Sequence, residues 1–260
     1  MNSAVILCGG KGTRLGSLGK KIPKALVSIH NKPIIWYIIN ILISKGFNHF
    51  ILPTGYKGIE IKKYIKKINN KNSNYKFDVI QTGVNTSISK RIYKIKNKII
   101  SKNFILLNGD AIFDFNLEKI FKSHIQNKAK ITFIGCEAIL NYGIVGIKNN
   151  KIVNFERDLV FNSAKCKRDE KFIGYIYSGI SIMNKDILKH NFKNYKNFEK
   201  EFYPLIIKKY KTSFKELVGR WYSIDNQKDI KLLIEKKNNK GFSFINKIKK
   251  KLNNEKKFLV

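Results

Sequence analysis

The sequence predicts an α/β fold, in which a Rossmann-like, mixed but mostly parallel sheet is flanked by helices. Two observations support this prediction. Short apolar runs of strand length recur along the chain, and helical patterns separate most of them. Parallel strands need long crossover connections, which are usually helices, so the alternation predicts parallel strands. The 260 residues are enough to bury one substantial core, and we expect one main domain.

Five short apolar runs are the predicted buried strands of the first half of the chain. They cover residues 4–7, 49–52, 77–80, 104–107 and 130–134.

Helices are predicted between these strands. Pro33 opens the amphipathic run PIIWYIINILISKG, which closes at Gly46, and proline and glycine are typical helix start and stop signals. Further helices are expected over residues 58–68 and 89–99.

The second half has a more mixed pattern. Strands are expected near residues 142–148, 151–156 and 174–183, and a helix near residues 198–210. We assign residues 1–235 to the domain and residues 236–260 to a strongly basic C-terminal tail.

The tail contains a candidate amphipathic helix. Phe242, Ile245, Ile248 and Leu252 recur at near-helical spacing. Packing of this helix on the domain is the favoured interpretation. Contact with an anionic membrane, or with a partner subunit in a homo-oligomer, stays open as an alternative.

The charge of the chain is strongly positive but is a weak indication of function. There are 52 lysine and arginine residues against 18 acidic residues, which gives a formal net charge of +34. A nucleic-acid footprint should cluster on one face, whereas these lysines are spread along the whole chain, so we expect no nucleic-acid partner.

Cysteine usage and hydropathy bound the location of the protein. Cys8, Cys136 and Cys166 are far apart and show no zinc-ligand spacing, so neither a disulfide framework nor a zinc site is expected. No stretch approaches eighteen apolar residues and the N-terminus lacks a signal-peptide pattern. We expect a cytoplasmic protein without stable membrane anchoring.

A glycine-rich, basic loop follows the first predicted strand. It does not match the dinucleotide fingerprint, because Gly16 lies four residues after Gly12 instead of three. It does not match the Walker loop either, because Lys21 follows Gly19 and Lys20 where serine or threonine is required. Glycines nevertheless let backbone N–H groups approach an anion, and nearby cations neutralise phosphate. A basic surface turn without a ligand is the alternative.

Two aspartates are candidate metal ligands. Asp110 follows a predicted strand in the sequence NGD, and Asp225 lies at a strand-to-helix junction. Ligands of open α/β sheets gather at the carboxyl ends of strands, so the loop at residues 8–24 and the NGD sequence should meet in one crevice. Mg²⁺ usually takes one or two protein carboxylates. Helix capping is the alternative role for both, and Asp114 is expected to be structural.

The ordered set of motifs CGGKGTRL, PKAL, NKPIIWYII, NGD, NYGIVGI, YSGISIM and GRWYSID resembles the sugar-1-phosphate nucleotidyltransferases over about residues 3–235. This resemblance implies a nucleotidyltransferase fold of the GT-A-like type. Within the family, the stretch VIQTGVNTSISKRIYKI is most similar to glucose-1-phosphate cytidylyltransferase, which favours CTP. NGDAIFDFNL and YSGI are equally similar to heptose- and muramate-1-phosphate members that use GTP or UTP.

The resemblance implies an Mg²⁺-dependent enzyme that joins a nucleoside triphosphate and a sugar 1-phosphate to give a nucleotide sugar and pyrophosphate, for surface polysaccharide biosynthesis. The implied catalytic residues are Arg14, Lys24 and Asp110, and the implied metal ligands are Asp110 and Asp225. The implied nucleotide-binding residues are Leu7, Gly9, Gly10, Gly12, Thr13, Arg14, Gln81, Gly83 and Thr86. The implied sugar-phosphate residues are Gly143, Arg157, Tyr177 and Gly179.

The acceptor side departs from the family pattern. Where the family commonly has F-x-E-K-P, whose lysine binds the sugar phosphate, this chain reads NFERDLV, with Arg157 and Asp158. Arg157 is therefore the candidate substitute, with Lys165 and Lys167 as other candidates. A GTP- or UTP-using heptose-, muramate- or mannose-1-phosphate enzyme, a cytidylyltransferase for a phosphate that is not a sugar, and a non-catalytic nucleotide-binding protein stay open.

Overall fold

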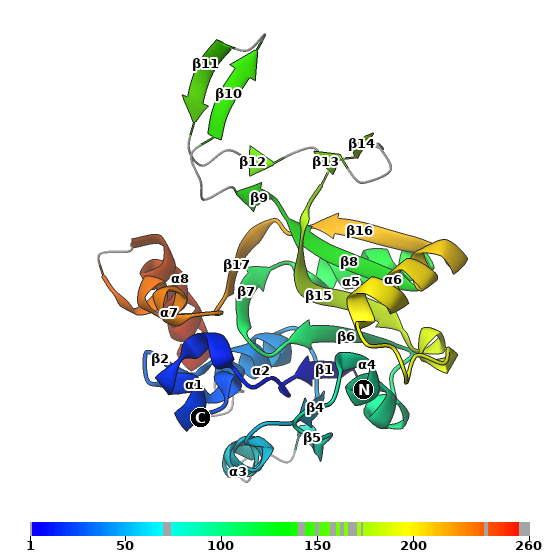
Figure 1. Ribbon diagram of the computed structural model, residues 1–260. Helices are drawn as coiled ribbons and strands as arrows, with labels where there is room; N and C mark the ends of the chain where they lie inside the picture. The colour runs from blue at the N-terminus through cyan, green and yellow to red at the C-terminus, as the bar shows by residue number, and fades with distance from the viewer. Residues whose placement is uncertain are drawn as a thin grey trace.

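A seven-stranded sheet forms the centre of the computed structural model, which describes residues 2–69, 74–139, 144–148, 151–156, 160–161, 164–165, 171–172, 174–236 and 239–254 (Figure 1). Only one strand, β15, pairs antiparallel with its neighbours, and the other pairings are parallel. The predicted mixed, mostly parallel sheet is confirmed. In spatial order its strands are β16 (Thr212–Glu216), β8 (Ile131–Cys136), β15 (Ile176–Asn184), β6 (Asn103–Asn108), β1 (Ser3–Leu7), β4 (His49–Thr54) and β5 (Lys76–Gln81).

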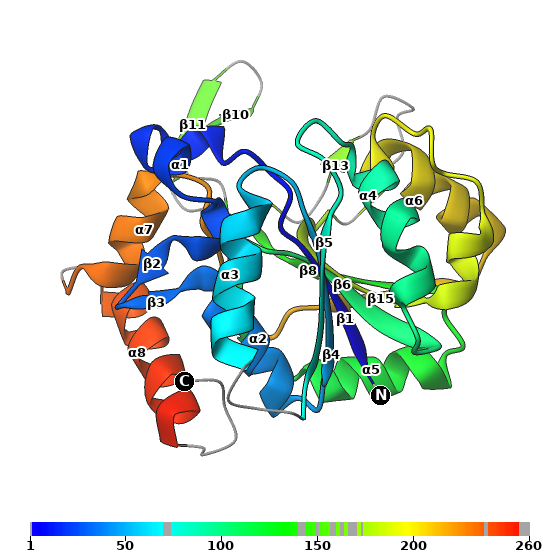
Figure 2. The same ribbon diagram turned by 90° about the horizontal axis from the view of Figure 1, so that it is seen from below.

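Helices cover both faces of the sheet (Figure 2). Alternate residues of a strand point to opposite faces, and in β1 Ala4 and Ile6 join one apolar core while Val5 joins the other. The first core is covered by α2 (Ile34–Ser44), α3 (Gly58–Asn69) and α5 (Leu117–Gln126), and the second by α4 (Ile88–Ile95) and α6 (Phe198–Lys209).

Short elements connect and extend this framework. The glycine-rich loop carries η1 (Thr13–Leu15), α1 (Ser17–Lys21) and η2 (Lys24–Leu26), followed by the hairpin of β2 (Ser28–Ile29) and β3 (Lys32–Pro33). Two short 3₁₀ helices, η3 (Lys96–Lys98) and η4 (Lys185–Lys189), follow α4 and β15. β7 (Ala111–Phe115) pairs antiparallel with β17 (Gly219–Ser223), which leads to α7 (Gln227–Ile234).

Short antiparallel pairs lie beyond the edge of the main sheet. The pair β10 (Ile144–Lys148) and β11 (Lys151–Glu156) extends away from it (Figure 1). The other pairs join β9 (Ala138–Ile139) to β12 (Val160–Phe161) and β13 (Ala164–Lys165) to β14 (Lys171–Phe172).

All five strands predicted from apolar runs are present, as β1, β4, β5, β6 and β8. The elements that were not predicted include β7, α5 and β16. β16 is an edge strand of sequence TSFKE, so it has no continuous apolar run. The buried stripe of α5 includes His124, which a hydropathy pattern counts as polar.

Helix α2 differs from the amphipathic helix that was predicted there. Every residue from Ile34 to Ile43 is buried, including Asn40, whose amide donates a 2.9 Å hydrogen bond to the Trp36 carbonyl. A helix that is apolar all round must be covered on every side. The side away from the sheet is covered in part by α8 (Asn239–Asn254), which contacts both α2 and α7.

The tail helix α8 packs on the domain through its apolar stripe. Of the predicted stripe, Ile245, Ile248 and Leu252 are buried in the first core, and Phe244 joins them. Phe242 is only half-buried, with its ring against that of His30. At the polar edge of the helix, Lys249 Nζ donates a 2.9 Å hydrogen bond to the His30 carbonyl. The stripe is therefore not available to a membrane or to a partner subunit. No helix in the described parts of the chain is long and apolar enough to cross a bilayer.

We expect buried His124 to make the stability of the fold sensitive to acid. Its ring is buried, with Nδ1 2.8 Å from Thr132 Oγ1, and burial lowers its pKa from 6.5 to about 4. The unfolded chain then binds a proton more tightly than the folded one, so stability is full above pH 6.5 and falls as the pH drops toward 4. We expect His124 to account for about 2 kcal/mol of the loss between pH 7 and pH 5.

Urea unfolding at pH 7 and pH 5 tests this prediction. The difference in unfolding free energy between the two pH values should shrink by about 2 kcal/mol in His124→Gln. His190→Gln is the control, since the His190 ring is not buried and hydrogen-bonds to the hydroxyl of exposed Tyr210. An unchanged difference in His124→Gln would contradict the assignment.

Candidate active site

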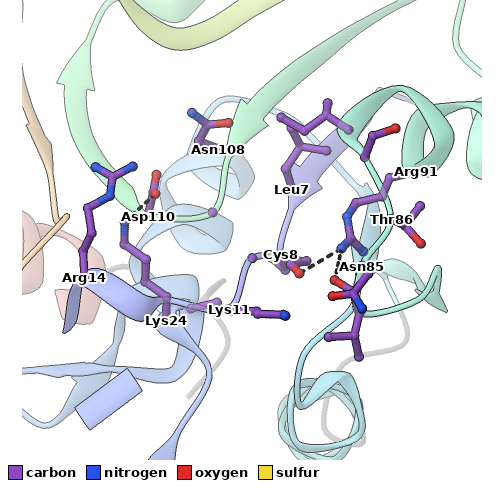
Figure 3. A pocket seen from close by; sticks show the side chains of 17 residues that line it. Leu7, Cys8, Lys11, Arg14, Lys24, Asn85, Thr86, Arg91, Asn108 and Asp110 are labelled. Atoms are coloured by element: carbon purple, nitrogen blue, oxygen red, sulfur yellow. Dashed lines mark hydrogen bonds and ion pairs between the residues drawn. The ribbon is translucent and has the colours of Figure 1, made fainter. Parts of the chain in front are cut away.

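A cavity of about 640 Å³ lies where β1 and β6 end (Figure 3). Three chain segments line it. They are the glycine-rich loop (residues 8–24) with Leu7 before it, the end of β6 with Asn108 to Asp110, and residues 84–91, which lead into α4. The crevice predicted between the glycine-rich loop and the NGD sequence is therefore present, at the carboxyl ends of parallel strands.

The glycine-rich loop leaves the sheet at Leu7 and curls back over its own backbone. Gly12 has a φ of 64°, a left-handed conformation that favours glycine, and its carbonyl accepts a 3.0 Å hydrogen bond from the Leu15 amide. Leu15 is fully buried and fixes this turn to the core. Gly9, Gly10 and Arg14 line the cavity, while Gly12 and Thr13 form the turn behind it.

Lys24 joins the two predicted metal ligands. Its Nζ lies 2.7 Å from Asp110 Oδ2 and 2.9 Å from Asp225 Oδ1. Arg14 also reaches Asp225, at 3.3 Å, although most of its side chain is exposed. Residues 14, 24, 110 and 225, taken from four parts of the sequence, thus form one charged cluster at an edge of the cavity.

Strand pairing explains how Asp110 and Asp225 come together. Ser223 at the end of β17 lies opposite Ala111 at the start of β7. Asp110 immediately precedes Ala111 and Asp225 follows Ser223 by two positions, so the register places both aspartates at the same end of this strand pair. The Ile224 amide reinforces this by donating a 2.9 Å hydrogen bond to the Asp110 carbonyl.

Asp225 does not cap the helix that follows it. Asn226 is the N-cap of α7, and its side chain forms a capping box with Asp229. Burial alone would raise the pKa of Asp225, but the hydrogen bond and charge of Lys24, together with Arg14, hold that pKa below its ordinary value. Asp225 is therefore ionised, and its carboxylate faces Lys24 and Arg14 instead of capping α7.

The donor set fits Mg²⁺. Two carboxylates converge on one cationic position, which the Lys24 ammonium holds in this structure. The described residues include no group of three or more histidine, cysteine, aspartate or glutamate side chains that could hold a metal. A pair of carboxylates is the usual protein contribution to an Mg²⁺ site, whose other ligands are water and substrate phosphates.

The predicted base-reading residues lie on the opposite side of the cavity, in and before the loop at residues 82–87, called the 82–87 loop below. Thr86 lines the cavity. The Gln81 side chain is engaged instead with β4, since its amide donates to the Gly55 carbonyl at 2.8 Å and its oxygen accepts from Thr54 Oγ1. Gly83 has a φ of 110°, which shapes the start of the loop.

The predicted sugar-side residues divide between two situations. Tyr177 and Gly179, on β15, line a second, small hollow that shares Leu7 and Asn108 with the main cavity. The Tyr177 hydroxyl lies 3.0 Å from that of Tyr203, and burial chiefly raises the pKa of Tyr177 to about 12, so the phenol stays neutral. Gly143 and Arg157 lie outside the described residues.

Several cavity-lining residues were not identified from the sequence. They include Lys11, Asn108 and, most notably, the buried Arg91 on α4. A signal for Arg91 was available, because the chain has only five arginines among its 52 basic residues. In a chain that uses lysine for most cations, an arginine marks a position where a planar guanidinium is needed.

Comparisons with known proteins agree with this geometry. The profile of the family described as "Nucleotidyl transferase" matches residues 3–230. A probable glucose-1-phosphate cytidylyltransferase of Bacillus subtilis (strain 168) is 30% identical over 257 residues, covering 92% of this chain and 96% of the relative. A D-glycero-alpha-D-manno-heptose 1-phosphate guanylyltransferase of Aneurinibacillus thermoaerophilus is 31% identical over 203 residues, covering 76% of this chain and 82% of the relative.

A solved structure is similar over almost the same length. HddC from Yersinia pseudotuberculosis, complexed with GMP-PN, superposes with a TM-score of 0.63 at 26% identity, covering 91% of this chain and 99% of that one.

A pair of neighbouring glycines tests the packing of the glycine-rich loop. A Cβ at Gly9 would collide with the guanidinium of Arg91, whereas a Cβ at Gly10 would meet no atom within 4 Å. We expect Gly9→Ala to lower the free energy of unfolding by about 1–3 kcal/mol, as overpacking does. Gly10→Ala is the matched control and should change it by less than about 0.5 kcal/mol. Equal unfolding midpoints in urea for the two variants would contradict the packing described here.

Proposed function

Because the chain belongs to the nucleotidyl transferase family, and its relatives include sugar-1-phosphate nucleotidyltransferases, we propose that it joins CTP and a sugar 1-phosphate in an Mg²⁺-dependent reaction. The products are a CDP-sugar and pyrophosphate. The observation that carries the proposal is the charged cluster of Lys24, Asp110 and Asp225 beside a cavity lined by the glycine-rich loop.

The reaction requires alignment and charge neutralisation more than acid–base chemistry. An oxygen of the sugar phosphate attacks the α-phosphorus of the nucleotide in line, and pyrophosphate leaves on the opposite side. The attacking oxygen is already anionic, so no base needs to remove a proton from it. The barrier arises chiefly from bringing two anions together, and fixed cations lower it.

Lys24 and Arg14 are the chain's own cations for this task. In the proposal Lys24 exchanges its carboxylate partners for phosphate oxygens, which its flexible stem allows without moving the backbone. Arg14 is largely exposed and pairs with Asp225 alone among the described residues, so its side chain can turn toward the triphosphate. Gly9 and Gly10 keep side chains away from the loop surface, so a phosphate can approach the backbone closely.

Asp110 and Asp225 are the proposed metal ligands. When bound, Mg²⁺ supplies positive charge that offsets the repulsion between the two phosphates. Asp110 is held by the turn between β6 and β7, and Asp225 by its Ser223 hydrogen bond at 3.2 Å, so both carboxylates are positioned before a ligand arrives.

The choice of CTP rests on similarity to the cytidylyltransferase relative, which covers nearly the whole chain. GTP is the second candidate, because the heptose 1-phosphate guanylyltransferase relative is equally similar over a shorter stretch. Glucose and heptose 1-phosphates are accordingly the first acceptors to test, and Arg157 is the proposed replacement for the family's acceptor lysine.

A substrate panel tests the reaction. We expect pyrophosphate release with Mg²⁺ when CTP is supplied with one sugar 1-phosphate from a set that includes glucose, mannose, heptose and muramate derivatives. GTP, UTP, dTTP and ATP are run in parallel, together with each nucleotide alone as a control. A folded protein that binds a nucleotide yet releases no pyrophosphate with any pair would overturn the proposed function in favour of a binding role.

Single substitutions test the charged cluster. We expect Lys24→Met and Asp110→Asn each to lower turnover by about 10²–10³-fold, because each removes a group proposed to neutralise transition-state charge. Lys45→Met is the control, since Lys45 is similarly half-buried and faces a carboxylate, that of Glu118, far from the cavity. Steady-state pyrophosphate release at saturating substrates measures the effect. Turnover in Lys24→Met that equals turnover in the control would remove Lys24 from the mechanism.

A further inference from the structure

Arg91 lies at the base of the cavity and is 5% exposed. It extends from α4 to three separate backbone segments. Two of these interactions are the dashed lines at Arg91 in Figure 3. One terminal nitrogen donates to the Thr54 carbonyl at 3.0 Å and to Thr82 Oγ1 at 2.5 Å. The other donates to the Gly9 carbonyl at 3.0 Å and to the Val84 carbonyl at 3.2 Å. A single side chain therefore fastens the glycine-rich loop, the end of β4 and the 82–87 loop together.

The two terminal nitrogens of Arg91 have no donor to spare. A guanidinium carries four N–H bonds on these nitrogens, and the four hydrogen bonds above account for all of them. A ligand contact through either nitrogen would break one of these four bonds. Arg91 is thus built to hold the two loops that face the cavity, and its influence on a ligand passes through their positions and through its charge.

The backbone around Arg91 is shaped to admit the guanidinium. A Cβ on either Gly9 or Gly55 would overlap the terminal part of the Arg91 side chain. Both glycines are therefore needed for a reason separate from phosphate approach. The close fit holds the planar guanidinium of Arg91 in one orientation. A lysine side chain has no planar group and cannot form the same set of hydrogen bonds.

The charge of Arg91 has no carboxylate partner among the described residues, in contrast to that of Lys24. Its four acceptors are all uncharged. A buried cation without a counter-ion is costly, and an anion in the adjoining cavity offsets that cost. The guanidinium is thereby a fixed source of positive potential on the side of the cavity away from Asp110 and Asp225.

We propose that Arg91 is a positioning residue that couples recognition of the base to placement of the triphosphate, by joining the 82–87 loop to the glycine-rich loop. This rests on the proposed function, in which the first loop contacts the base and the second the phosphates. A wrong base displaces the 82–87 loop, and through Arg91 it also displaces the Gly9 carbonyl and the phosphate site. Selectivity for the base then depends on a residue that need not contact the base.

Two variants separate the charge of Arg91 from its geometry. Arg91→Met removes both, and Arg91→Lys keeps the charge but cannot span both loops with a planar fork. Lys90→Met is the matched control, because Lys90 is exposed on the same helix turn and its loss changes the net charge equally. Dissociation constants for CTP, GTP, UTP, dTTP and ATP are measured by calorimetry, and KM values for nucleotide and sugar phosphate by pyrophosphate release.

We expect Arg91→Met to raise the dissociation constant of the preferred nucleotide by roughly tenfold or more. The ratio of the dissociation constants of the next-best and the preferred nucleotide, called the nucleotide ratio below, should fall by a similar factor. Arg91→Lys should keep much of the affinity for the preferred nucleotide that Arg91→Met loses, but it should not keep the nucleotide ratio. The KM for the sugar phosphate should stay within about twofold in both, and Lys90→Met should match the wild type.

A purely structural role would lower the melting temperature and leave the nucleotide ratio unchanged, and that result overturns the proposal. If Arg91→Met does not fold, Thr82→Val removes one acceptor of the fork at almost constant volume. Thr82→Val should also lower the nucleotide ratio, by a smaller factor than Arg91→Met. An unchanged nucleotide ratio in Thr82→Val again overturns the proposal.

The outcome for Arg91 is separable from the outcome for the proposed function. Wild-type protein that binds a nucleotide but releases no pyrophosphate defeats the proposed function, while the dissociation constants still decide the role of Arg91. Wild-type protein that binds none of the five nucleotides defeats both.

Discussion

The bridge from Lys24 to Asp110 and Asp225 is the constraint on which the site depends. Lys24 lies 86 residues before Asp110 and 201 residues before Asp225 in the chain. Without a cation between them, the two carboxylates would repel each other. The β7–β17 pairing sets their separation, and the short helix η2 delivers the ammonium. A strand register, a loop conformation and a charge balance therefore have to be correct together.

The charges of the cavity are arranged in two different ways. At one end, Lys24 and Arg14 are balanced by two aspartates, so the cluster is close to neutral and a cation can be exchanged within it. At the other end, Arg91 is held by backbone carbonyls and keeps its full charge. An anionic ligand that carries a metal ion on the side of the two aspartates would match the charges at both ends of the cavity. The net charge of the chain, spread over its surface, explains neither arrangement.

Sequence reasoning recovered the parts of the molecule that depend on local pattern. Strands β1, β4 and β6 are continuous apolar runs buried on both faces, and such runs are recognisable without any knowledge of their neighbours. The meeting of the glycine-rich loop with Asp110 followed from a general rule about where parallel strands end. The edge strand β16 and the complete burial of α2 depend on distant partners, so local periodicity could not reveal them.

The candidate site shows the same division. Lys24 and Asp110 stand in short motifs and were identified, whereas the role of Arg91 depends on carbonyl groups of Gly9, Thr54 and Val84 that no sequence pattern registers. The assignments of Gln81, Gly83 and Thr86 to the base, and of Tyr177 and Gly179 to the sugar, stay predictions.

The covering of α2 by α8 has a consequence for how the chain is made. Helix α2 is complete after residue 44, but the helix that shields part of its apolar surface begins at residue 239. At a synthesis rate of about 5–20 residues per second, the ribosome needs roughly 10–40 s to produce the intervening chain. During that interval the part of α2 that α8 later covers stays exposed, and chaperones that bind exposed apolar segments can act there.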